Sequence, residues 1–169
     1  ETSFSPRFDF GTGGFLGASS RSHPSAGRDG TGGYFFKYEQ NLSRTQRMFF
    51  ESYISARSFF QIATHTLPSS EQCQLGGLNS VRGYPEGDYL ADVGGSISTD
   101  WIFPAYFFPR QWKVPGSDVS LRRQIEPFVF VDVGLGKLDA VLPGERDHKF
   151  LMGTGGGVQI HFRRNFSMR

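Results

Sequence analysis

The sequence has no long apolar run and few of the residues that favour helices. No stretch of about 18 consecutive apolar residues occurs, so a transmembrane helix is excluded. Its 18 Phe, 6 Tyr, 2 Trp and 22 Gly favour strands and close backbone approaches over helices. A membrane-spanning β-barrel needs only about 10 alternating residues per crossing, so modest hydropathy leaves a membrane location open.

Other absences narrow the function. The single Cys73 can form neither an internal disulfide nor a thiolate metal cluster, and we expect it to be a packing residue. The 18 Lys and Arg nearly balance the 16 Asp and Glu, without the basic block of a nucleic-acid surface. The stretch Glu1 to Phe10 lacks the basic start and apolar core of a signal peptide, so we expect one to have been removed or the chain to be partial.

Apolar and polar residues alternate along most of the chain, which predicts β-strands. The pattern is clearest in Glu126–Leu138, where Val129, Val131, Val133 and Leu135 share one face and Phe128, Phe130, Asp132, Gly134 and Gly136 share the other. The predicted strands are Phe4–Ala18, Tyr34–Leu42, Met48–Phe60, Asp92–Phe103, Glu126–Leu138, His148–Arg163 and a last one cut off within Asn165–Arg169.

The connections between these strands differ in length. Asn41–Arg47 is short, whereas Ser19–Gly32, Ile62–Ala91 and Asp139–Asp147 are longer and rich in Gly, Pro or charge. Short turns at one end and long loops at the other are typical of outer-membrane barrels. Pro104–Gln124 departs from this pattern, because it should be a short turn yet spans about twenty residues. Alternation alone fits a soluble β-sandwich or barrel equally well.

Two motifs favour the membrane interpretation. The connection Leu67–Asp88 contains Val81-Arg82-Gly83-Tyr84, and a later strand carries the Phe-x-Asp-x-Gly motif as Phe130, Asp132 and Gly134. In this order they resemble the signatures of the outer-membrane protein translocase and insertase superfamily, and most closely the two-partner secretion transporters of the haemolysin secretion/activation type. Cys73 departs from the family, which usually has an aromatic residue there.

The resemblance implies an all-β fold, an antiparallel transmembrane β-barrel. Residues 1–169 would then form the C-terminal part of the translocase domain, about six to seven strands of a larger barrel, without the periplasmic repeats and the final strand. The signature loop, residues 62–91, would fold back into the barrel lumen. The implied location is the outer membrane of a Gram-negative bacterium or of a bacterium-derived organelle.

A loop inside a barrel must keep Arg82 from bulk water, where an unpaired guanidinium is costly, so it needs an acceptor on the wall. Asp132 lies on the polar face of its strand and can accept a bidentate pair, and the family carries the same contact. We expect Gly136, Gly153 and Gly155 to leave room for the loop, and Tyr84 to be its aromatic anchor.

The leading interpretation is a pore that exports an unfolded exoprotein across the outer membrane. Its partners would be that polypeptide, the lipid bilayer, and the remaining strands and periplasmic repeats of the same protein. An insertase for other barrels, a passive pore or adhesin, and a soluble β-domain enzyme are the alternatives. We expect no enzyme activity, cofactor, metal or nucleic acid. The Gly-rich 153–157 stretch lacks the following helix of a phosphate loop, and the four His residues lie on different elements.

Overall fold

The computed structural model describes residues 1–12, 31, 33–109, 111–113, 120–139, 141, 143–162 and 166–168. The parts of our predictions that fall on residues 13–30, 32, 110, 114–119, 140, 142, 163–165 and 169 lie outside the described residues. The described chain is all-β apart from one turn of helix, α1 (Leu121–Gln124). No helix within the described ranges is long and apolar enough to cross a membrane.

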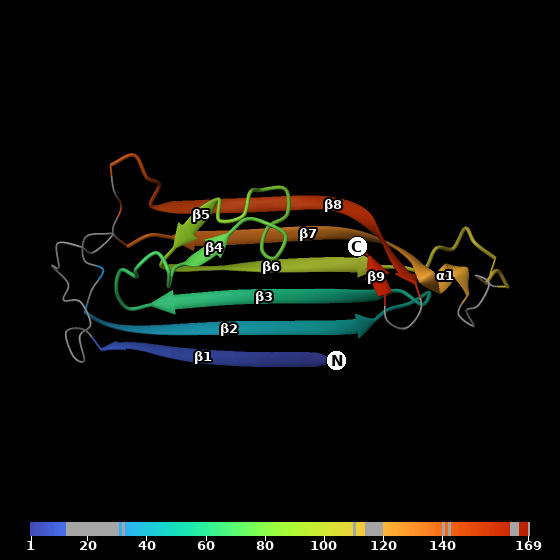
Figure 1. The fold of residues 1–169 in the computed structure, drawn as a ribbon, viewed down its shortest axis with the longest axis horizontal. Helices are drawn as coiled ribbons and strands as arrows, with labels where there is room; N and C mark the ends of the chain where they lie inside the picture. The colour runs from blue at the N-terminus through green and yellow to red at the C-terminus, as the bar shows by residue number, and fades with distance from the viewer. Residues whose placement is uncertain are drawn as a thin grey trace.

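Seven strands form one antiparallel sheet in the order β1-β2-β3-β6-β7-β8-β9 (Figure 1). They are β1 (Thr2–Thr12), β2 (Tyr34–Arg47), β3 (Tyr53–Ala63), β6 (Val93–Ile102), β7 (Ile125–Lys137), β8 (His148–Phe162) and β9 (Phe166–Met168). Every neighbouring pair is antiparallel, as alternation in a sheet with two different faces predicts.

Most predicted strands are confirmed within a few residues, but the first turn is wrong. Asn41–Arg47 is not a turn: β2 continues to Arg47, paired with β3 over this whole stretch and with β1 as far as Arg44. The chain turns instead at residues 48–52, so the strand predicted from Met48 begins at Tyr53. Polar residues on both faces of the end of β2 resemble a turn in sequence, but pairing with β3 satisfies their backbone as a strand.

The true turn is made by aromatic residues. Phe50 and Glu51 have positive φ of 54° and 57°, and the Ser52 hydroxyl donates to the Phe49 carbonyl at 2.7 Å. Phe49 also packs edge-on against Trp101 of β6, with ring centroids 6.3 Å apart. Side-chain packing thus selects a conformation that turn propensities do not predict.

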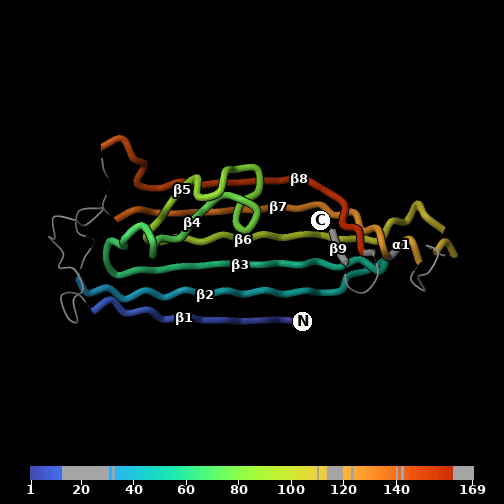
Figure 2. Tube along the Cα trace, viewed as in Figure 1, coloured from blue at the N-terminus to red at the C-terminus, as the bar shows by residue number. Residues whose placement is uncertain are grey.

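The described connections lie at the ends of the sheet where long and short ones were predicted. β1, β3 and β7 end together at one end, from which the connection after β3 leaves, and the 48–52 turn lies at the other (Figures 1 and 2). The predicted exception is also present, because the long connection from β6 to β7, with α1, lies at the short-turn end.

The connection from β3 to β6 folds back over one face of the sheet. It contains a small hairpin that we did not predict, β4 (Cys73–Leu75) paired with β5 (Tyr89–Ala91). Figure 1 shows this hairpin in front of β6, β7 and β8, and β4 contacts both β6 and β7. We call residues 64–92 the inner loop, the covered side of the sheet the loop face, and the other side the outer face.

The outer face is apolar and exposed. The register places large hydrophobic side chains of five strands on it: Phe4, Phe8, Phe10, Phe60, Ile62, Ile97, Trp101, Val129, Val131, Leu135, Phe150, Met152 and Val158. The loop face carries the polar partners, among them the fully buried Asp132. The side chains of β7 therefore alternate between the two faces as the sequence predicted.

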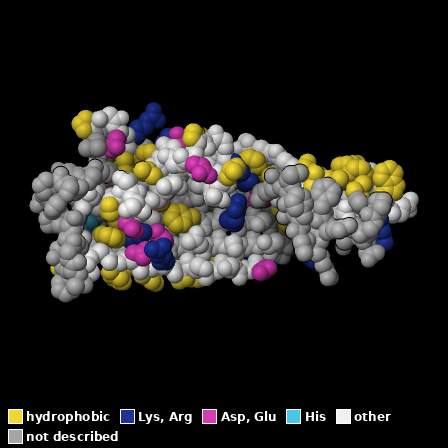
Figure 3. Space-filling view, in the orientation of Figure 1, with side chains coloured by type: hydrophobic (Ala, Val, Ile, Leu, Met, Phe, Trp, Pro, Cys, Tyr) yellow, Lys and Arg dark blue, Asp and Glu magenta, His cyan; other side chains and the backbone are white. Residues whose placement is uncertain are grey.

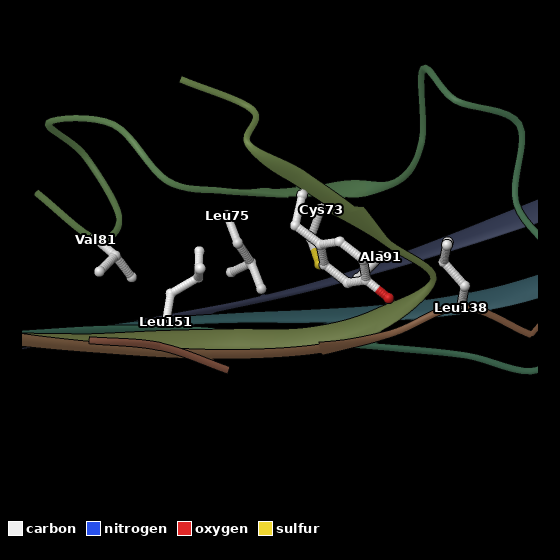
Figure 4. Close-up of a cluster of buried hydrophobic side chains, with 7 residues drawn as sticks. Cys73, Leu75, Val81, Ala91, Leu138 and Leu151 are labelled. Atoms are coloured by element: carbon white, nitrogen blue, oxygen red, sulfur yellow. The ribbon is translucent and has the colours of Figure 1, made fainter. Parts of the chain in front are cut away.

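The buried core lies between the inner loop, with its small β4–β5 sheet, and the loop face. Its members are Cys73, Leu75, Val81, Tyr89, Ala91, Leu138 and Leu151 (Figure 4). Leu75 and Val81 are 0% exposed although both belong to a loop. Burial raises the pKa of the Cys73 thiol to about 12, consistent with the expected packing role.

We predict that Leu75→Ala loosens the inner loop. Because Leu75 is 0% exposed, the truncation removes buried apolar surface and leaves a cavity, at a cost of about 2–5 kcal/mol. Protease cleavage within residues 76–88 of the folded protein in detergent should become faster. Leu78→Ala is the matched control, since Leu78 of the same loop is 74% exposed. Equal cleavage of the two variants would contradict the assignment of this core.

Candidate functional site

The tip of the inner loop is built from glycine-permitted turns. Gly77 donates its N–H to the Tyr84 carbonyl at 3.1 Å, which closes the tip, and Ser80 donates to the Gly77 carbonyl at 3.3 Å. Gly83 has φ of 95° with open space around it, so glycine is required there for its backbone and not for its size. The closed tip directs Val81 and Arg82 at the sheet.

Arg82 makes the ion pair that the sequence predicted. Its Nε and Nη2 atoms donate to Oδ2 and Oδ1 of Asp132, both at 2.6 Å, and its backbone N–H donates to Oδ2 at 3.0 Å. The side chain of Asp132 is 0% exposed and that of Arg82 is 10% exposed. This is a bidentate, charge-assisted pair shielded from water, the strong form of such an interaction.

Two further groups complete the guanidinium site. Nη1 of Arg82 lies 2.7 Å from Oδ1 of Asp100, whose side chain is 3% exposed, and its Cζ lies 3.7 Å from the centroid of the Phe130 ring. The cation is thus held between two carboxylates and an aromatic face. Hydrogen bonding to Asp132 is the main reason that the pKa of Arg82 is raised, so this side chain stays charged.

The pairing register of β6 and β7 brings the side chains around Arg82 together. β6 and β7 pair Asp100 with Phe130, and Ser98 with Asp132, so all four side chains point to the loop face in adjacent rows. Ser98 donates its hydroxyl to the Ser80 carbonyl at 2.9 Å, which adds a neutral contact to the loop tip. The wall therefore holds both the charged side chain and the backbone of the tip.

Glycines on β7 and β8 make the close approach possible. A Cβ at Gly153 would lie 2.1 Å from the Arg82 carbonyl oxygen, and one at Gly134 would lie 2.8 Å from Cγ2 of Val81. A Cβ at Gly136 would meet Leu75 and Ala91 at 2.8 Å. These positions contact the loop directly, in agreement with our expectation for Gly136 and Gly153.

Gly155 is a correction. A Cβ there would lie 2.9 Å from the Phe130 ring, and its three nearest atoms all belong to that ring and not to the loop. The register explains this, because Gly155 is paired with Phe130 and gives the large ring room across the strand. Gly155 therefore acts on Arg82 indirectly, by letting Phe130 lie flat beneath the guanidinium. Tyr84 packs against the edge of the core cluster, as expected for an aromatic anchor.

The base of the inner loop is fixed separately from its tip. The carboxylate of Asp92, 0% exposed, accepts hydrogen bonds from the Leu67 N–H at 2.9 Å, Gln72 Nε2 at 3.0 Å and the Asp139 N–H at 3.0 Å. Gln61 of β3 donates to the carbonyls of Asp92 and Glu71. One carboxylate thus joins both ends of the loop to the β7–β8 connection, and we call these contacts the root.

Charged pairs brace the root on both sides. The Lys37 side chain of β2 is 3% exposed, and its Nζ lies 2.6 Å from Oε2 of Glu71 and 2.9 Å from Oε1 of Glu39. On the opposite side Lys149 of β8 lies 2.6 Å from Asp88 of the loop. The inner loop is therefore tied to strands on both sides of β6 and β7.

Sequence reasoning missed Asp100 and the root. Alternation predicts a strand over Asp92–Phe103, but only the register shows that Asp100 lies beside Phe130. The same pattern makes Asp92 the first residue of that strand, and nothing in it indicates three donors far apart in sequence. Within the described part of the chain, no three His, Cys, Asp or Glu side chains converge as a metal site requires.

The fold and the site together define a class of protein. An antiparallel sheet with an exposed apolar outer face, and a loop held on its polar face by a buried ion pair, has the features of the wall of an outer-membrane transporter. The family model of the haemolysin secretion/activation proteins ShlB/FhaC/HecB matches residues 2–160. The chain belongs to this family of two-partner secretion proteins of the outer membrane. No curated protein and no solved structure matches it.

We predict that Arg82→Ala releases the loop tip. The change leaves the buried Asp132 and Asp100 without their cation, at a cost of about 3–5 kcal/mol. A spin label at position 86 should gain mobility. Arg82→Lys should recover only part of the order, because an ammonium cannot form the bidentate fork. The control is Arg57→Ala, because Arg57 is an exposed arginine on the loop face of β3. A label at position 86 that is equally mobile in both alanine variants would rule out the Arg82–Asp132 pair as the anchor.

Proposed function

We propose that the protein exports an unfolded exoprotein across the outer membrane through the lumen of a β-barrel of which this sheet is a part. The observation that carries the proposal is the Arg82 site: a loop of nearly thirty residues is held against the polar wall at its tip by a charged cluster. Family membership supports it, because two-partner secretion supplies an exoprotein as the substrate. The step needs no covalent chemistry, and the substrate would pass as an extended chain.

The two faces of the sheet support the orientation. An apolar outer face would contact lipid, and the polar loop face would line the lumen, as in membrane barrels whose strands alternate. With lipid outside, the inner loop would occupy the space that a translocating polypeptide needs. Transport then requires the tip to move, and the Arg82 cluster is the contact that must be broken and remade.

The root and the tip have different parts in this mechanism. The root contacts of Asp92 are buried and join three separate segments, so we expect them to persist while the tip moves. The tip is held by the Arg82 cation and backbone N–H, by the Ser98 hydroxyl and by the buried Val81. Replacing one set of charged contacts with water or with groups of the passing chain is the smallest change that frees the lumen.

A disulfide lock tests the requirement for tip movement. An ideal Cβ at Gly134 lies 2.8 Å from Cγ2 of Val81. The double variant Val81→Cys, Gly134→Cys therefore places the two Cβ atoms close enough for a disulfide, which needs a Cβ–Cβ distance of about 3.5–4.5 Å. We expect oxidised cells to stop secreting the exoprotein and reduced cells to resume. The single-cysteine variants are the controls for both substitutions, and the high pKa of Cys73 keeps that thiol from competing.

Secretion that continues with the disulfide formed would refute movement of the tip. The amount of other barrel proteins in the outer membrane of the same cells tests the insertase alternative. If the disulfide depletes these barrels while exoprotein secretion continues, the function is barrel assembly. If the protein is a passive pore or adhesin, the disulfide changes neither secretion nor the amount of other barrels.

We also predict that an arginine on the outer face destabilises the protein in lipid vesicles. Val131→Arg should lower the free energy of unfolding, by at most the about 2–4 kcal/mol that an arginine costs at the bilayer midplane. Asn41→Arg is the matched control, because Asn41 is exposed on the loop face of β2. Urea titration in vesicles, followed by the gel mobility of the folded form, measures both variants. Equal stability would mean that the outer face does not contact lipid.

A further inference from the structure

The connection from β6 to β7 carries an unusual group of exposed aromatic side chains. With the neighbouring 48–52 turn it forms what we call the aromatic platform: Phe49, Phe50, Tyr106, Phe107, Phe108 and Trp112. Phe50 is 77% exposed, Phe107 is 72% exposed and Trp112 is 53% exposed. Figure 3 shows hydrophobic side chains gathered at this end of the molecule, beyond the strands.

The described part of the platform is held in place by specific contacts. The Ala105 N–H donates to the carbonyls of Arg122 and Ile125, both at 3.2 Å, and the Leu121 N–H donates to the Trp112 carbonyl at 2.7 Å. The Tyr106 hydroxyl donates to the Phe50 carbonyl, which joins the connection to the turn. The Arg122 guanidinium lies 4.3 Å from the centroid of the Tyr106 ring. The backbone is therefore braced while the rings stay exposed.

The platform is continuous with the outer face. Ring centroids are 5.4 Å apart between Phe49 and Phe50, 6.3 Å between Phe49 and Trp101, and 6.2 Å between Trp101 and Phe103. Trp101 belongs to the outer face and is 41% exposed. An unbroken series of aromatic contacts thus leads from the outer face of β6 to the platform.

On the β2 side of the sheet the outer face becomes polar at the row of Trp101, whereas on β7 the same row carries Val129. In the register, Trp101 is paired with Ile54, which is paired with Gln46 of β2. Gln46 accepts a hydrogen bond from Arg44, the preceding outer-face residue of β2, and Trp101 donates its indole N–H to the Ser52 hydroxyl at 3.2 Å. Polar groups on the outer face and a tryptophan with a bonded N–H mark a membrane–water boundary. The platform lies just beyond this row.

We propose that the aromatic platform lies in the lipid headgroup layer of the leaflet at the short-turn end and anchors the sheet there. This inference rests on the proposed function for its lipid-facing outer face. Aromatic rings with polar tips are favoured in that layer, and the cations of Arg122, over the Tyr106 ring, and of Lys113, exposed and next to Trp112 in the chain, suit anionic phosphates. The described part of the long connection is then an interfacial anchor, in place of a tight turn such as residues 48–52 form at the same end.

Depth-dependent quenching in the full-length protein tests the proposal. A bimane fluorophore is attached at Phe107→Cys, and the protein is reconstituted in vesicles of phosphatidylcholine and phosphatidylglycerol. The lipids carry bromines near the headgroup or near the chain ends, and iodide quenches from water. Val131→Cys on the outer face and Glu86→Cys on the exposed part of the inner loop are the reference positions.

We expect headgroup-level bromines to quench the label at position 107 about twofold more than deep bromines, as for a group at the interface. Position 131 should show deeper quenching and position 86 none from lipid. A label at 107 quenched only by iodide, or protected from both lipid and iodide as under a protein domain, would overturn the proposal while position 131 still supports lipid contact. Absence of lipid quenching at 131 would instead refute the membrane-spanning sheet on which the proposal rests.

Discussion

The guanidinium of Arg82 is the group around which the loop face is organised. Its charge is nearly out of contact with water, so the wall must supply acceptors in fixed positions. Asp132 and Asp100 supply the charge and Phe130 the flat surface beneath it. Glycines at 134 and 153 are required because any side chain there would push the tip away from those acceptors.

This constraint also explains why the two faces of the sheet differ so strongly. The loop face is filled by the inner loop, so its core forms between loop and sheet, with Leu75 and Val81 as the buried hydrophobic residues. The outer face has no such cover among the described residues and carries many large exposed apolar side chains. A sheet of this kind is stable only where a lipid or another apolar medium takes the place of a second layer.

The sequence was informative wherever one strand determined the result. Period-two alternation was sufficient for most strands and for the faces of β7, because the register of a sheet with unlike faces admits no shift of one residue. The Arg82–Asp132 pair was predictable because two motifs mark its ends. The turn at Phe49 and Phe50, the carboxylate of Asp100 and the hydrogen bonds of Asp92 were not, since each depends on residues from different strands that only the register brings together.

The position of the root sets the reach of the tip. Arg82 lies ten positions after Gln72 and ten positions before Asp92, so the two arms of chain that join the tip to the root are equally long. A fully extended chain spans at most about 3.3–3.6 Å per residue, which gives each arm a limit of about 35 Å. In the proposed mechanism, Asp92 stays bonded, and a detached tip remains within that distance of the root even if the β4–β5 pairing opens. The return of the tip is then a search over a bounded volume, which limits its entropic cost.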